Sequence, residues 1–92
     1  MSSATDTEIR RIVADALEGT SVSAALRGDP RLAAFLEGEA DVPIAELGMD
    51  SLDVMEFCIS IELSTGVSVV PGDLQELGTL AKVADAIRTR RA

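Results

Sequence analysis

The chain has 92 residues, of which 47% are hydrophobic and 26% are charged, and its formal net charge is -8. This length suits one small core, so we expect a single domain over 1–92 rather than an enzyme with a large enclosed pocket. The balance of 16 acidic against 8 basic residues argues against the basic footprint of a nucleic-acid binder and suits a basic protein partner.

The first predicted helix starts at a capping box formed by Thr5 and Glu8. Apolar residues then recur at 9, 12, 13, 16 and 17, which is the spacing of one helix face. Gly19 ends this pattern and therefore the helix.

Residues 20–43 form a long connector that we expect to contain a short helix over 30–37. Asp29 and Pro30 supply its start signals and Gly38 supplies its stop signal. Its apolar face, expected to pack on the bundle near the start of the next main helix, consists of Leu32, Phe35 and Leu36. A weaker turn is predicted over 22–27.

A brief turn over 44–47, closed by Gly48, leads to a helix over 51–64 that Asp50 can cap. One apolar stripe of this helix consists of Leu52, Met55, Cys58 or Ile59, and Leu63, and the further apolar residues Val54, Phe57 and Ile61 lie on its other faces. A helix apolar over so much of its circumference is either central to the bundle or shows an apolar patch to a partner.

The chain after Gly66 is predicted as a loop whose valines fill the core, followed by a helical turn over 73–77 and a last helix capped by Thr79. The sequence therefore predicts an all-α fold, a small four-helix bundle with a long first loop that holds an extra short helix. The residues expected to be buried together are Ile12, Val13, Leu17, Leu63, Val69, Val83 and Ile87.

The stretch Gly48-Met49-Asp50-Ser51-Leu52 resembles the phosphopantetheine attachment motif of acyl carrier proteins. The similarity extends on both sides and covers roughly 43–88. It implies a bundle of acyl-carrier type in which Ser51 takes a 4′-phosphopantetheine arm from coenzyme A. The thiol of the arm then carries acyl groups as thioesters. Asp50 and Leu52 are implied to flank the cofactor site.

The chemistry of the chain agrees with this resemblance. A phosphodiester on Ser51 would lie against the unpaired N–H groups at a helix start. The chain has no His, so it holds no His metal site and no triad base that could activate Ser51. We therefore expect no enzyme but a substrate of a phosphopantetheinyl transferase, with no metal. Taken alone, Ser51 and Asp50 would be read as helix caps.

Cys58, the only cysteine, is expected to be a small core residue without a catalytic role. A lone cysteine and the lack of a secretory signal suit a reducing cytoplasm. The longest uninterrupted apolar run, 32–36, is too short to cross a membrane. We expect a monomer that binds neither nucleic acid nor membrane.

Between 32 and 81 there are ten acidic residues and no Lys or Arg. The resemblance implies that this surface docks on basic patches of acyl-loading and acyl-processing enzymes, by fast and salt-sensitive association. The residues implied for partner docking are Asp53, Met55, Glu56, Ile59 and Glu62, with Leu52 as a further apolar contact.

The leading interpretation is an acyl carrier protein that shuttles acyl intermediates between enzymes of a fatty-acid, polyketide or related biosynthetic pathway. A peptidyl or aryl carrier that loads an amino or aryl acid is the alternative, although Asp50 before the serine favours an acyl carrier. An unmodified helical interaction module is the third reading. Two departures from the family, the long connector and Thr65 in place of a common bulky aromatic, leave the subtype open.

Overall fold

A computed structural model describes residues 2–20 and 29–91, and this part of the chain contains five α-helices, one short 3₁₀ helix and no strand. The elements are α1 (Ser2–Glu18), α3 (Pro30–Leu36), η1 (Ile44–Leu47), α4 (Ser51–Thr65), α5 (Pro71–Leu77) and α6 (Leu80–Arg91). The predicted all-α bundle with an extra short helix in the first connection is confirmed. The turn predicted over 22–27 lies outside the described residues.

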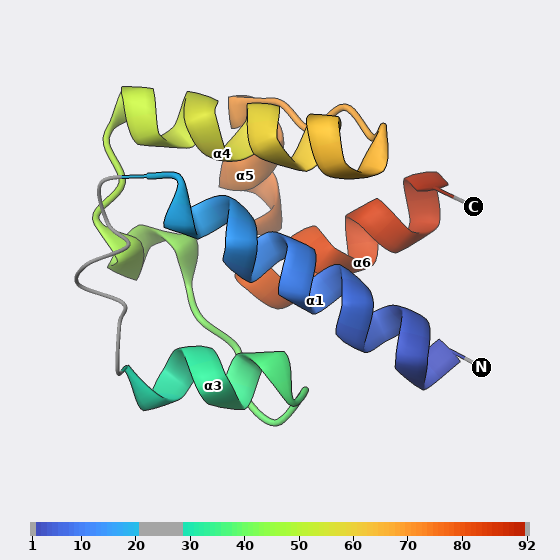
Figure 1. The fold of residues 1–92 in the computed structure, drawn as a ribbon. Helices are drawn as coiled ribbons and strands as arrows, with labels where there is room; N and C mark the ends of the chain where they lie inside the picture. The colour runs from blue at the N-terminus through green and yellow to red at the C-terminus, as the bar shows by residue number, and fades with distance from the viewer. Residues whose placement is uncertain (1, 21–28, 92) are drawn as a thin grey trace.

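Helix α1 is the element around which the others are arranged, because it contacts α3, α4 and α6 (Figure 1). Its predicted apolar stripe faces the core, although Ile12 is only half-buried. The helix begins at Ser2, so Thr5 lies inside it and the predicted capping box is wrong. Residues 2–4 include neither Gly nor Pro, and nothing in them prevents one more helical turn.

The core is built from aliphatic side chains and both phenylalanines, and Phe35 and Phe57 are fully buried. Of the residues expected in the core, the ones that are buried are Val13, Leu17, Val69, Val83 and Ile87. Leu63 was expected there too, but it is 82% exposed and the prediction is wrong for it. Leu63 lies on the outer face of α4, whereas Phe57 and Ile61 occupy the inner face.

Helix α3 confirms the predicted short helix in the connector. The Asp29 carboxylate accepts a hydrogen bond from Arg31 N–H (2.9 Å), and Gly38, at φ +78°, adopts the left-handed conformation that follows the helix end. Its position differs from the expectation, because α3 packs on α1, on the side away from α4 (Figure 1). Phe35 explains this choice, since it is buried and its ring lies 4.9 Å from the Arg10 guanidinium carbon.

The segment between α3 and η1 is tied to the start of α6. Val42 C=O accepts from Leu80 N–H (3.0 Å), and Ile44 N–H donates to Gly78 C=O (2.9 Å). The Asp41 carboxylate accepts from Ala81 N–H (2.9 Å), which caps α6 from a distant part of the chain. Burial alone would raise the pKa of Asp41, but hydrogen bonds from Ala81, Thr79 and Val42 outweigh it and hold the pKa below its ordinary value.

Replacing Asp41 with Ala is expected to lower the free energy of unfolding by about 1 kcal/mol at neutral pH, the usual cost of losing a helix cap. Because folding lowers the pKa of Asp41, this stabilisation is complete above the ordinary Asp pKa and is lost as the pH falls through the lower folded value. Urea unfolding of both proteins between pH 7 and roughly pH 3 should therefore show a shrinking difference.

The matched control is Asp85→Ala, which removes an exposed carboxylate from the same helix. It should change stability by less than about 0.5 kcal/mol. Equal stability of wild type and Asp41→Ala at pH 7 would contradict the capping role, and so would a difference that grows on acidification.

Candidate functional site

The start of α4 is fixed by a reciprocal capping box. The Asp50 carboxylate accepts from Asp53 N–H (2.8 Å), and Asp50 N–H donates to the Asp53 carboxylate (3.3 Å). Gly48, at φ +72°, turns the chain from η1 into this cap. Ser51 is therefore the first residue of α4, and its side chain is exposed.

Asp53 has a structural position rather than the surface position that partner docking requires. It is 3% exposed, in contrast to Glu56 and Glu62, which are exposed on the same helix. Its carboxylate is engaged in the capping box and faces inward. The Asp53 carboxylate is thus occupied in the helix cap, and the expectation that it takes part in docking stays a prediction.

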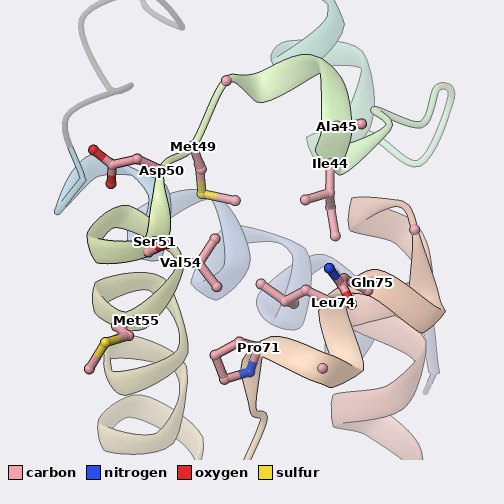
Figure 2. Close-up of a pocket in the computed structure, with 13 residues that line it drawn as sticks. Ile44, Ala45, Met49, Asp50, Ser51, Val54, Met55, Pro71, Leu74 and Gln75 are labelled. Atoms are coloured by element: carbon pink, nitrogen blue, oxygen red, sulfur yellow. The ribbon is translucent and has the colours of Figure 1, made fainter.

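An open cleft of about 740 Å³ lies beside Ser51. Three elements form its walls: the first turns of α4, the η1 turn and helix α5 (Figure 2). Figure 2 shows that Val54 and Leu74 approach each other across the cleft, with Pro71 below them, whereas the Asp50 carboxylate points away. The residues with apolar side chains that line it are Ile44, Ala45, Met49, Val54, Met55, Pro71 and Leu74. The polar side chains that line it belong to Asp50, Ser51 and Gln75.

The outer face of α4 carries an exposed apolar stripe. The stripe consists of Leu52 (63% exposed), Met55 (52%), Ile59 (51%) and Leu63 (82%). At 3.6 residues per turn, these positions share one face, and Glu56 and Glu62 fall on its two edges. The opposite face, with Phe57 and Ile61, is buried. Of the two roles expected for such a helix, the structure therefore shows both: α4 packs in the bundle and exposes an apolar patch.

The α5 wall of the cleft was not foreseen from the sequence. Pro71, Leu74 and Gln75 are about twenty residues beyond Ser51 and were assigned only to a loop and a helical turn. Helix α5 begins at Pro71, two residues before the predicted start, because Pro suits the first helical position and the Asp73 carboxylate accepts from Val70 N–H (3.1 Å). Pro71 is the signal in the sequence that indicates this earlier start, because Pro favours the first turn of a helix.

Cys58 lies on the buried side of α4, away from the apolar stripe. Burial raises the pKa of its thiol, and the negative charge of Asp73 acts in the same direction. The thiolate is the reactive form, so this environment suppresses nucleophilic chemistry at Cys58. Cys58 is thus placed as a core residue, whereas Ser51 is exposed and lines the cleft.

The family model of the phosphopantetheine attachment site matches residues 33–87, which is more than half of the chain. The chain belongs to this family. It is therefore a phosphopantetheine carrier of the acyl carrier protein family, and the family's prosthetic group is covalently attached 4′-phosphopantetheine. No curated protein and no solved structure gives a significant match. None of the helices in the described part of this carrier has the length and apolar character of a membrane span.

The position of Asp53 leads to a prediction about stability. Asp53→Ala should lower the free energy of unfolding by about 1–2 kcal/mol, because it removes half of the capping box that starts α4. Urea unfolding followed by circular dichroism measures this. Glu56→Ala, three residues further along the same helix and exposed, is the control and should lie within about 0.5 kcal/mol of wild type. If both variants unfold like wild type, the capping box does not stabilise the carrier.

Proposed function

We propose that the carrier holds its phosphopantetheine arm on Ser51 and shuttles acyl intermediates between enzymes of a fatty-acid, polyketide or related biosynthetic pathway. The observation that carries the proposal is the exposed Ser51 at the first turn of α4, on the rim of an apolar cleft. The chain acts as a substrate of its enzymes and performs no catalysis itself.

The surroundings of Ser51 fit the phosphodiester of the arm. The 15-residue helix α4 directs its positive end and its unpaired N–H groups towards an anion bound there. The Asp50 carboxylate is engaged with Asp53 N–H and points away from the cleft (Figure 2), which reduces its repulsion of a phosphate. When attached, the arm supplies a thiol that holds acyl groups as thioesters.

The lining of the cleft favours an acyl cargo over an aminoacyl one. Most of its side chains are aliphatic or thioether groups, which gain free energy by covering a hydrocarbon chain. A free ammonium group would instead need a carboxylate inside the cleft. Asp50 supplies the only carboxylate among the lining residues, and it points outward (Figure 2). A peptidyl or aryl carrier is therefore the second candidate.

The outer face of α4 is proposed as the docking surface for the transferase and for pathway enzymes. Its apolar stripe offers area that a partner can cover, and Glu56 and Glu62 on the two edges favour a partner with a basic rim. Leu52 joins this stripe directly to Ser51. We propose that the carrier works as a monomer in the cytoplasm, as one domain over 1–92.

The modification itself can be measured by intact mass. Incubation with coenzyme A, Mg²⁺ and a broad-specificity phosphopantetheinyl transferase should add one arm of about 340 Da to wild type. In this step the Ser51 oxygen bonds to the phosphorus that carries the pantetheine, and adenosine 3′,5′-bisphosphate leaves. Ser51→Ala should remain folded and unmodified. Ser60→Ala, which keeps Ser51, is the matched control and should be modified like wild type. An unmodified wild type, alongside a control carrier that is converted, would contradict the proposal.

The docking surface is tested by reversing its charges. Glu56→Lys with Glu62→Lys should slow modification by the transferase roughly tenfold at low salt, because attraction to a basic partner is replaced by repulsion. Added salt should slow the wild type and reduce the difference between the two proteins.

The control for this experiment is the double reversal of Asp15 and Glu18, two exposed acids on α1 that give the same change in net charge. It should affect the rate much less, because its charges lie on another helix. Equal rates for the two double variants would show that total charge matters and that the face of α4 does not.

A further inference from the structure

The η1 wall of the cleft is a single turn of four residues, so its position depends on a few contacts. Ile44 and Ala45 line the cleft from this turn. At its start, Ile44 N–H donates to Gly78 C=O (2.9 Å), and at its end Leu47 is buried. One short helical turn is not stable in isolation, and its order comes from such tertiary contacts.

The outer side of this turn is bound to α3. Glu46 accepts a hydrogen bond from the Arg31 guanidinium at 2.6 Å. The same guanidinium lies 3.3 Å from the Asp29 carboxylate, and that carboxylate caps α3 through Arg31 N–H. Arg31 is therefore held at the first turn of α3 and reaches from there to the cleft wall.

Helix α3 is itself held on α1, so Arg31 projects to η1 from a helix whose position is fixed. Phe35 is fully buried, and Arg10 of α1 donates to Phe35 C=O at 2.9 Å while its guanidinium covers the Phe35 ring. A continuous series of contacts thus runs from α1 through Arg10 and Phe35 to α3, and through Arg31 and Glu46 to η1.

We propose that Arg31 is a positioning residue for the acyl cargo: its ion pair with Glu46 holds η1 in place and so fixes one wall of the cleft beside Ser51. This inference rests on the proposed acyl-carrier function. The Arg31 and Glu46 side chains are 45% and 55% exposed. An exposed ion pair adds little to global stability and weakens with salt. Its effect is therefore expected in the local order of η1, and not in the unfolding of the bundle.

Amide hydrogen exchange on the unmodified protein tests this directly. The reporters are Ile44 N–H and Glu46 N–H, which are hydrogen-bonded to Gly78 and Pro43. Arg31→Glu and Glu46→Arg should each speed their exchange by roughly two- to fivefold, the range expected for an exposed pair. The double variant restores opposite charges at the two positions and should return the rates close to wild type.

Two controls keep the exchange result specific. Arg88→Glu breaks another exposed ion pair, that of Arg88 with Asp85 on α6, with the same change in net charge, and should leave Ile44 and Glu46 unaffected. Circular dichroism should show that Arg31→Glu keeps its helices, since an acidic residue suits the first turn of α3. Wild-type exchange rates in Arg31→Glu would overturn the proposal, and so would a double variant that exchanges as fast as the single ones.

The cargo is tested by loading an octanoyl-phosphopantetheine arm from octanoyl-coenzyme A and following loss of the thioester by intact mass. Arg31→Glu should lose the octanoyl group several-fold faster than wild type, because a displaced wall covers the chain less, and Arg88→Glu should match wild type. If both proteins accept the octanoyl arm and Arg31→Glu loses it at the wild-type rate, the proposed role of Arg31 would be overturned, whereas the proposed carrier function would stand. Failure of all variants to accept the arm would overturn the proposed function, and with it any role of Arg31 towards a cargo.

Discussion

The rotation of α4 about its own axis is the constraint on which the rest of the site depends. Two faces of this helix are apolar, and packing against α1 and α5 buries the one that contains Phe57 and Ile61. Once that face is buried, helical geometry leaves Leu52 and Ile59 outside and brings Ser51 to the rim of the cleft. The buried Asp53 carboxylate fixes the same orientation at the helix start, because it closes the cap with Asp50. The position of Ser51 at the cleft and the exposure of the apolar stripe thus share one cause.

The charged residues of the carrier are distributed unevenly over its helices. The cations that form ion pairs within the described residues are on α1, α3 and α6, and α4 has none of its own. Glu56 and Glu62 take part in none of those ion pairs, so their field extends into solvent along the outer face of α4. A field of this kind acts on the approach of a partner more than on the stability of the bundle. The same surface also exposes apolar area, which makes contact favourable once a basic partner has been attracted.

Local signals in the sequence predicted the order of elements well, because each depends on a few neighbouring residues. Asp29, Pro30 and Gly38 marked α3, and Gly48, Gly66 and Gly78 all adopt the left-handed conformation at helix or turn ends. The motif around Ser51 likewise pointed to the family. Periodicity could not choose between the two apolar faces of α4, and Leu63 was therefore misplaced. That choice depends on which side chains fit against α1, a tertiary property that spacing along one helix does not contain.

The position of α3 was mispredicted for the same reason, because it too depends on tertiary packing. An apolar face predicts that a helix will pack, but the ring of Phe35 beneath Arg10 determines that it packs on α1. A helix placed over Ser51 would instead have restricted access to that residue. Seated on α1, α3 does not cover the start of α4, and within the described residues Arg31 joins it to Glu46 of η1. Helix α3 can therefore act on the wall of the cleft without covering the outer face of α4.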